Sequence, residues 1–133
     1  MANEMIITLP GELKVDAEYR GLTIKTDQPK YAGGDGSASR PFDLFLASIG
    51  TCVGSYIAIF CKEREIPYKD IKVILTTERG EKSKPLSKVH MDIQLPADFP
   101  DKYKDAVIRS VDQCAVKRAI MDPPDFEIVT SKP

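Results

Sequence analysis

Residues 41–64 read PFDLFLASIGTCVGSYIAIFCKER and contain the most apolar stretch of the chain. Pro41 suits the first turn of an α-helix, and Asp43 places a carboxylate near the positive end of the helix dipole. Pro67 ends the pattern, so the sequence predicts one helix from Pro41 to about Arg64. Its apolar residues lie on nearly all sides, which indicates burial on most faces.

This helix approaches the length of a membrane span, but two serines and two glycines interrupt it, and four charged residues, 62–65, follow. A buried helix explains the composition better than a transmembrane one. A single domain of 133 residues can hardly cover such a helix alone. The sequence therefore predicts a homodimer, in which the second copy covers what the first leaves exposed.

Length and charge narrow the class of protein. At 133 residues the chain has the size of one domain, 1–133, and its 42% hydrophobic and 29% charged residues are a globular balance. Nineteen basic and twenty acidic residues leave a formal net charge of −1, which argues against nucleic acid or an anionic membrane as a partner. Met1–Pro10 lacks the basic region and cleavage site of a signal peptide, so we expect a cytoplasmic protein.

Strand-like alternation precedes the helix in three segments, Met5–Leu9, Glu12–Glu18 and Leu22–Thr26. Arg20-Gly21 makes a tight turn between the last two, so an antiparallel meander is expected. Residues 27–40 are rich in glycine, aspartate and serine and predict a loop.

The second half of the chain predicts a hairpin, a helix and a final strand. Ile71–Thr77 and Ser87–Leu95 alternate like strands, with a charged connection between them. Apolar residues at helical spacing predict one helix from Pro100 to about Met121, and Phe126–Thr130 predicts a last short strand. The expected order is βββ-α-ββ-α-β, an α+β fold with antiparallel sheets and a long buried central helix.

Three cysteines are too few, and too odd in number, for a disulfide scaffold, so any disulfide is expected to be functional. Cys52 lies in the helix between Gly50 and Gly54, although glycine is costly inside a helix. That cost suggests the close approach of another group. The alternative is that the small residues merely let another helix pack tightly.

The other two cysteines differ in their sequence context. Cys114 is followed by Lys117 and Arg118, which would supply the positive potential that a reactive thiolate needs, although a packed core cysteine would look similar. Cys61 falls at the polar end of the first helix and is expected to be an ordinary packed thiol.

Several common sites are not expected. His90 is the only histidine and lies with Lys88 and Asp92 on the polar face of a strand, and without a CxxC or HxxxH spacing we expect no metal site. The loop Gly33-Gly34-Asp35-Gly36 lacks the pattern of a phosphate-binding loop, so no cofactor is expected. A serine-hydrolase triad is also not indicated.

A family resemblance lies in this loop and the helix after it. The segment Gly33-Gly34-Asp35-Gly36, followed by SRPFDLFLASIGTC at residues 39–52, resembles the Gly-rich loop and Pro-x-Glu-Leu-Leu-x-x-x-x-Gly-x-Cys core of the OsmC/Ohr family. The resemblance continues through REIP at residues 64–67 and into residues 71–73. A second match, DQCAVKRAI at residues 112–120, is similar to the family's Cys-Pro-Val-His-Arg-Thr-Leu segment, with Ala115 and Lys117 in place of proline and histidine.

The resemblance, which extends over residues 20–130, implies an OsmC-like fold and an intertwined homodimer with active sites at the interface. In the family's peroxidase branches the first cysteine attacks a hydroperoxide and becomes a sulfenic acid. The second cysteine then forms a disulfide with it, which a dithiol such as a lipoyl group reduces. Carried over, Cys52 would be the peroxidatic cysteine and Cys114 the resolving one, and an apolar interface would favour organic hydroperoxides.

The chain departs from the peroxidase branches at the residue after Pro41. Those branches have a glutamate there, which orients an arginine against the thiolate, whereas here Phe42 follows and the carboxylate comes at Asp43. A shift of one residue turns a helical side chain by about 100°, so Asp43 cannot simply replace that glutamate and is as well explained by the helix N-terminus. The pattern resembles less characterised OsmC-like branches. The candidates for the arginine are Arg20, Arg40 and Arg118.

The leading hypothesis is a thiol-dependent peroxidase-like oxidoreductase that reduces organic hydroperoxides through Cys52 and Cys114. Arg20, Arg40 and Asp43 are the candidate supporting residues. One rival is a non-catalytic protein that binds a small apolar ligand, which the missing glutamate and the apolar Phe42 favour. Another is a thiol enzyme of sulfur or acyl transfer.

Overall fold

The structure is a computed structural model that describes residues 4–133. It divides into two compact units, which meet in sequence between Ala47 and Ser48. The expectation about a signal peptide at Met1–Pro10 includes residues 1–3, which lie outside the described part of the chain.

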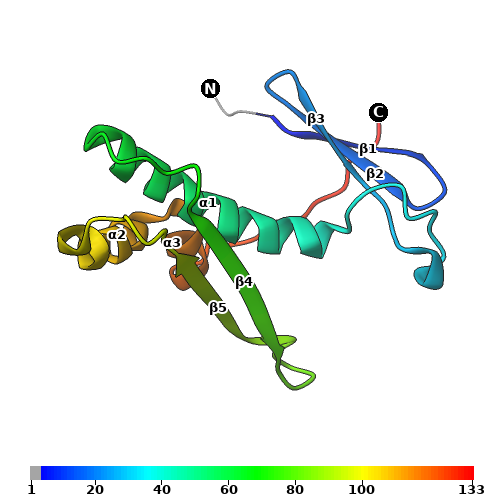
Figure 1. Cartoon of the computed structure of the whole chain (residues 1–133). Coiled ribbons are helices and arrows are strands. Elements are labelled where there is room, and N and C mark those ends of the chain that lie inside the picture. Colours follow the sequence, from blue (N-terminus) through cyan, green and yellow to red (C-terminus); the bar gives the residue numbers. More distant parts are fainter. Residues whose placement is uncertain (1–3) are drawn as a thin grey trace. The chain divides into compact units, whose positions relative to one another are not determined.

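The first unit contains the predicted antiparallel meander, with strands β1 (Ile6–Gly11), β2 (Lys14–Tyr19) and β3 (Leu22–Thr26) in the order β1-β2-β3 (Figure 1). Arg20 and Gly21 both have positive φ, 50° and 80°, which is the backbone of a two-residue hairpin turn whose twist matches the strands. The predicted turn between β2 and β3 is therefore confirmed.

The loop after β3 is organised around a buried carboxylate. Asp27 accepts hydrogen bonds from the Ser37 hydroxyl at 2.6 Å, the Ser37 N–H at 3.0 Å and the Gln28 N–H at 2.7 Å. Lys14 Nζ lies 3.9 Å from the same carboxylate and also pairs with Asp35. These hydrogen bonds, led by that of the Ser37 hydroxyl, lower the pKa of Asp27 to about 2.

Helix α1 (Pro41–Glu63) has the predicted extent. In the single chain its buried residues recur every three or four positions, so one face is covered. Other apolar side chains of the helix, among them Phe42, Phe45 and Ile59, are exposed. By length and composition α1 is the one helix in residues 4–133 that could cross a membrane, a test that core helices of soluble proteins also pass. The buried residues of α1 are Ile49, Val53, Ile57, Phe60 and Cys61.

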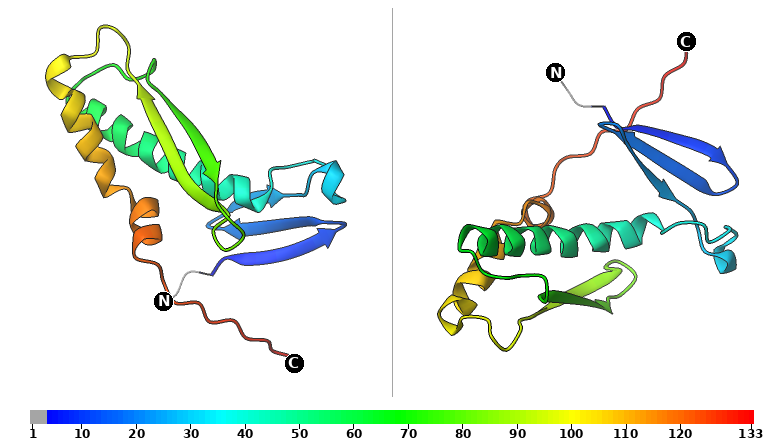
Figure 2. Two further views of the ribbon diagram at one scale, coloured as in Figure 1. Left: turned by 90° about the horizontal axis from the view of Figure 1, so that it is seen from below. Right: turned by 45° about the horizontal axis from the view of Figure 1, so that its top comes forward.

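In the second unit, β4 (Lys72–Arg79) and β5 (Leu86–Gln94) form the predicted antiparallel hairpin. Figures 1 and 2 show this hairpin alongside the middle of α1, and α2 near the C-terminal end of that helix. The inward side chains of β5, among them Met91 and Ile93, pack against the core, while His90 is exposed as expected. The core cluster comprises Val53, Ile57, Phe60, Cys61, Ile66, Phe99, Val107 and Cys114.

The prediction of one continuous helix from Pro100 to Met121 is wrong. The segment contains 3-10 turns at Asp101–Tyr103 and Val111–Gln113 and two short helices, α2 (Lys104–Ser110) and α3 (Ala115–Met121). The helix breaks at Cys114, whose ψ of 116° is extended. The break frees backbone N–H groups at the start of α3 for other acceptors, and apolar spacing cannot reveal it because the spacing continues across it.

The predicted last strand, Phe126–Thr130, is also wrong. Residues 122–133 form no strand within the described chain, and Phe126, Ile128 and Val129 are exposed. The physical reason is that alternating apolar residues make a strand only where another strand supplies hydrogen bonds. The observed order of regular elements is therefore βββ-α-ββ-αα, which remains an α+β fold with antiparallel sheets and a long helix.

Candidate active site

The second unit brings Cys52 and Cys114 together. Cys52 is held on α1 at the edge of the core and is partly accessible. A hydrogen bond from the Cys114 thiol is the largest cause that lowers the pKa of Cys52, followed by the N–H of Val116. Burial opposes this, and the N–H of Ala115 adds a smaller lowering effect. Hydrogen-bond donors around a sulfur favour its thiolate, which is the reactive form.

Cys114 has the opposite character. Its side chain is fully buried, and its sulfur caps α3 by accepting a hydrogen bond from the Lys117 N–H at 3.5 Å. Burial raises the pKa of this thiol, and the hydrogen bond that it donates to Cys52 raises it further. Within the pair, ionisation is therefore easier at Cys52 than at Cys114.

The break in the helix explains how the backbone reaches the two sulfurs. Because Cys114 is extended, the N–H groups of the next three residues have no carbonyl partner in a preceding helical turn. Those of Val116 and Ala115 face Cys52 and lower its pKa, and that of Lys117 donates to Cys114 Sγ. The Lys117 side chain itself pairs with Asp112, with Nζ 3.5 Å from Oδ1.

Sequence reasoning missed Ala115 and Val116, because they act through backbone groups that nearly every residue carries. One signal could have found them. The family's second-cysteine segment has proline directly after the cysteine, and proline is favoured at the first position of a helix. In this chain Ala115 occupies that position.

Arg40 and Asp43 form a pair within the first unit. Arg40 Nη2 donates to Asp43 Oδ1 at 2.9 Å and Nε donates to Oδ2 at 3.2 Å, while Nη1 lies 3.5 Å from the Tyr31 hydroxyl. Two bonds between a guanidinium and a carboxylate fix the direction of both groups. The hydrogen bond from Arg40 lowers the pKa of Asp43.

The other two candidate arginines lie elsewhere. Arg20 is in the turn after β2, and its Cζ lies 4.9 Å from the centre of the Tyr19 ring. Arg118 is an exposed residue of α3 in the second unit. Arg20, Arg40 and Asp43 belong to the first unit and the cysteine pair to the second, so a role for any of them at Cys52 stays a prediction.

Cys61 provides a contrast inside the same unit. It is fully buried in the core, as expected of a packed thiol. Burial raises its pKa, and the charge of Arg64 offsets only part of that effect. A buried thiol with a raised pKa reacts slowly, so Cys61 serves as an internal reference for Cys52.

The glycines beside Cys52 face different surroundings. A Cβ on Gly50 would lie 3.5 Å from the Leu75 side chain, whereas a Cβ on Gly54 would meet nothing within 4 Å. Both line a groove of about 300 Å³ together with Ala58. The chain by itself therefore leaves room at Gly54 for another group or helix to approach.

A separate cavity of about 450 Å³ lies between the hairpin and α2. Its walls are mostly apolar and include Val53, the residue after Cys52. Lys104 and Asp92 supply charges at this cavity. Within residues 4–133, no group of three or more His, Cys, Asp or Glu side chains is arranged to hold a metal ion.

Solved structures with this fold come from several bacteria. A protein from Psychrobacter arcticus, named as an osmotic stress induced and detoxification response protein, is 25% identical with a TM-score of 0.75, covering 90% of this chain and 88% of that one. A hypothetical protein from Aquifex aeolicus is 20% identical with a TM-score of 0.72, covering 92% and 89%. The organic hydroperoxide resistance protein OsmC of Legionella pneumophila is 21% identical with a TM-score of 0.55, covering 88% of each chain.

The comparison with curated proteins gives no match. The family model for OsmC-like proteins matches residues 34–129, a range that includes both Cys52 and Cys114. This match and the shared fold agree with the family resemblance of the two cysteine segments. The chain belongs to the OsmC-like protein family.

Proposed function

We propose that this protein is a thiol-dependent peroxidase-like oxidoreductase that reduces organic hydroperoxides through Cys52 and Cys114. The observation that carries the proposal is the hydrogen bonding of Cys52 by the Cys114 thiol and by the N–H groups of Ala115 and Val116. It lowers the pKa of Cys52, while burial and the same thiol hydrogen bond raise the pKa of Cys114. These are the properties that a peroxidatic and a resolving cysteine need.

The proposed reaction begins when the Cys52 thiolate attacks the terminal oxygen of the hydroperoxide. A sulfur–oxygen bond forms, the oxygen–oxygen bond breaks, and the alkoxide leaves as the alcohol after taking a proton. The Cys114 thiol then attacks the sulfenic acid on Cys52, which releases water and leaves a disulfide. A dithiol reductant restores both thiols and becomes a disulfide itself.

Arg40 is the arginine that we assign to the support of this chemistry. Asp43 lies three residues after Arg40 and holds its guanidinium by two hydrogen bonds. This pair would supply the arginine–carboxylate unit of the peroxidase branches from a different position along the chain. An ordered guanidinium loses less conformational entropy when it binds a thiolate than a freely rotating guanidinium does.

We further propose that the 133 residues act as one domain within a cytoplasmic homodimer. Apolar side chains that one chain leaves exposed on α1 and on β1, such as Ile59 and Ile7, support an apolar contact with a second copy. An apolar surface near the thiols would favour organic hydroperoxides over hydrogen peroxide. The Legionella pneumophila neighbour is named as an organic hydroperoxide resistance protein, which agrees with that preference.

Peptide mapping by mass spectrometry tests the proposal. Fully reduced protein is treated with stoichiometric cumene hydroperoxide, beside hydrogen peroxide and beside a Cys114→Ser variant. We expect a rapid Cys52–Cys114 disulfide in the wild type and a Cys52 sulfenic acid in the variant. A Cys52 that stays reduced, or reacts no faster than the buried Cys61, would overturn the peroxidase proposal.

A second candidate is a non-catalytic protein that binds a small apolar ligand. The cavity of about 450 Å³ favours it, because its size and apolar walls suit such a ligand. A Cys52→Ser variant separates the two candidates. Ligand affinity that is unchanged in this variant, in a protein that does not turn over hydroperoxides, would favour the binding role.

A further inference from the structure

A larger cavity, of about 680 Å³, lies in the second unit where α1 ends and the chain turns toward β4. Its other wall comes from the segment between β5 and α2. It contains neither Cys52 nor Cys114 and is distinct from the thiol pair. Cavities of this volume accommodate small-molecule ligands.

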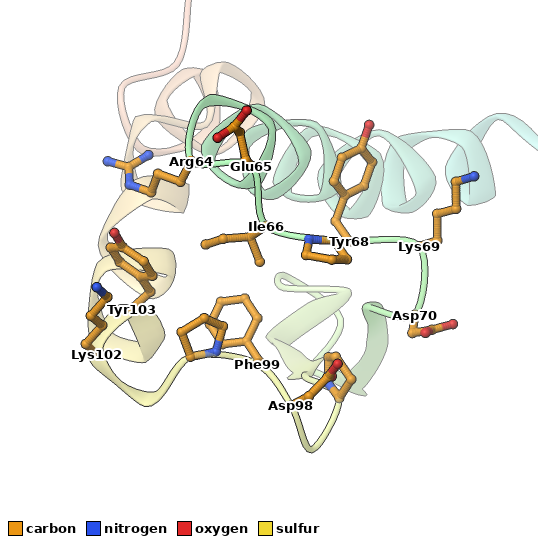
Figure 3. A pocket seen from close by; sticks show the side chains of 13 residues that line it. Arg64, Glu65, Ile66, Tyr68, Lys69, Asp70, Asp98, Phe99, Lys102 and Tyr103 are labelled. Carbon is orange, nitrogen blue, oxygen red and sulfur yellow. The ribbon is translucent and has the colours of Figure 1, made fainter.

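One side of the cavity is basic and aromatic. Figure 3 shows Arg64, Tyr103 and Lys102 together there. Arg64 Cζ lies 3.7 Å from the centre of the Phe60 ring and 5.9 Å from that of Tyr103, and Lys102 Nζ lies 5.1 Å from the Tyr103 ring. The Phe60 and Tyr103 rings meet edge to face at 82°. The aromatic pair therefore holds two cations beside one another.

These cations keep capacity for an anionic ligand. Arg64 uses Nη1 to donate to the Phe60 carbonyl at 3.0 Å, and its nearest carboxylate, Glu63, is 3.8 Å away, which is longer than a hydrogen bond. Lys102 makes no ion pair within residues 4–133. Its neighbour Asp101 pairs with Lys104 instead. The fixed guanidinium thus has N–H donors left over, and a carboxylate is the group that such a fork binds best.

The remaining walls have a different chemistry. Ile66 and Phe99 are buried and form an apolar floor between the two sides. Asp98 and Asp70 stand at the side opposite to Tyr103, with Lys69 next to Asp70 (Figure 3). A simple anion would satisfy only the basic side, and an apolar molecule would leave both sides unpaired.

We infer that this cavity binds a short peptide-like zwitterion with free ends. Its carboxylate lies against Arg64 and Lys102, its ammonium group lies toward Asp98, and its apolar side chain rests on Ile66 and Phe99. Arg64 and Lys102 at one side, the apolar floor, and Asp98 and Asp70 at the other side complement the two ends and the side chain of such a ligand, while Glu65 and Lys69 also line the cavity. This inference is independent of the thiol chemistry.

Titration of the protein with the tripeptide Ala-Leu-Ala, followed by calorimetry and by amide NMR shifts, tests the inference. We expect shifts centred on the amides of Ile66 and Phe99. Because charge-assisted hydrogen bonds contribute most of the selectivity, N-acetylation or C-amidation of the peptide should each weaken binding about tenfold or more. Replacing the middle leucine with serine should weaken it as well.

Matched variants assign each end of the peptide. Lys102→Gln should weaken binding of the free peptide but not of the amidated one. Asp98→Asn should weaken binding of the free peptide but not of the acetylated one. Lys82→Gln, in the β4–β5 connection, and Asp105→Asn, on α2, are controls that should change nothing. Absence of binding by the free peptide, equal binding of free and capped peptides, or shifts confined to other regions would overturn the inference. Alkylation of Cys52 in the same samples reports on the thiol site separately.

Discussion

At the scale of single residues, the thiol pair predicts that Cys114 controls the pKa of Cys52. The Cys114 thiol donates the hydrogen bond that lowers the pKa of Cys52 most. Cys114→Ala removes that donor and should raise the pKa of Cys52, whereas Cys114→Ser keeps a donor and should raise it less. The rate of Cys52 alkylation by iodoacetamide as a function of pH measures this directly, with the midpoint moving toward higher pH in the alanine variant.

The control for this measurement is Cys61. Burial raises the pKa of this thiol. Its alkylation should stay slow in all three proteins, because it is fully buried. Equal midpoints for Cys52 in the wild type and in Cys114→Ala would show that the hydrogen bond does not set the reactivity.

A second residue-scale prediction concerns Asp27. Its folded pKa of about 2 lies below its ordinary value of 3.8, because it accepts hydrogen bonds from Ser37 and Gln28. A carboxylate with a lowered folded pKa stabilises the fold above the unfolded value and loses that contribution as the pH falls through the folded value. The free energy of unfolding should therefore fall between about pH 4 and about pH 2.

Asp27→Asn tests this assignment in urea titrations across that range. The variant should be less stable than the wild type near neutral pH, because an amide accepts fewer and weaker hydrogen bonds from Ser37. Its stability should also change less with pH in the acidic range. Glu18→Gln, at the exposed position of β2, is a control that should follow the wild-type curve. An unchanged acid dependence in Asp27→Asn would contradict the role of this carboxylate.

At the scale of elements, the break before α3 is tested by placing a proline in it. Cys114 has the extended ψ that a residue before proline prefers, and Ala115 is the first residue of α3, where proline is tolerated. Ala115→Pro should therefore keep the fold, with a free energy of unfolding unchanged or raised by up to about 1 kcal/mol. The same change removes the Ala115 N–H from Cys52, so the pKa of Cys52 should rise slightly.

Thermal unfolding and the alkylation profile together check this variant. Val116→Pro is the informative comparison, because it removes the N–H that contributes more to the lowering of the Cys52 pKa and should shift the alkylation midpoint further. A continuous helix across residues 110–121 would instead make Ala115→Pro strongly destabilising, by about 3 kcal/mol or more. That outcome would remove the structural basis of the thiol site.

These elements also show what the sequence could and could not predict. The meander, the long helix and the hairpin were predicted correctly, since each has local alternation, a turn signal or a helix-ending proline. The break at Cys114 was not, because apolar periodicity passes through it and Ala115 carries no helix-start signal. The strand at Phe126–Thr130 failed for another reason, since strand formation depends on a partner that local pattern does not specify. The sequence singled out Cys52 and Cys114, which the structure brings together, but it did not single out the backbone groups of Ala115 and Val116 beside Cys52.

At the scale of the whole molecule, the open question is what covers the apolar surface of α1. Ile59 is 53% exposed although it belongs to α1, the most apolar stretch of the chain. An exposed residue contributes little to the stability of its own chain, whereas in the proposed homodimer it would be buried against the second copy. Substitution at this position therefore separates chain stability from association.

Ile59→Glu should weaken dimerisation about tenfold or more, because it places a charge in an apolar contact, while the far-ultraviolet circular dichroism of the chain stays the same. Sedimentation equilibrium over a range of concentrations measures the dissociation constant. Lys62→Glu, an exposed charged position on the same helix, is the matched control and should dimerise like the wild type. If Ile59→Glu and the wild type sediment alike as dimers, this face of α1 is not the interface. If both are monomers, the proposed homodimer itself is wrong, and another partner must cover the helix.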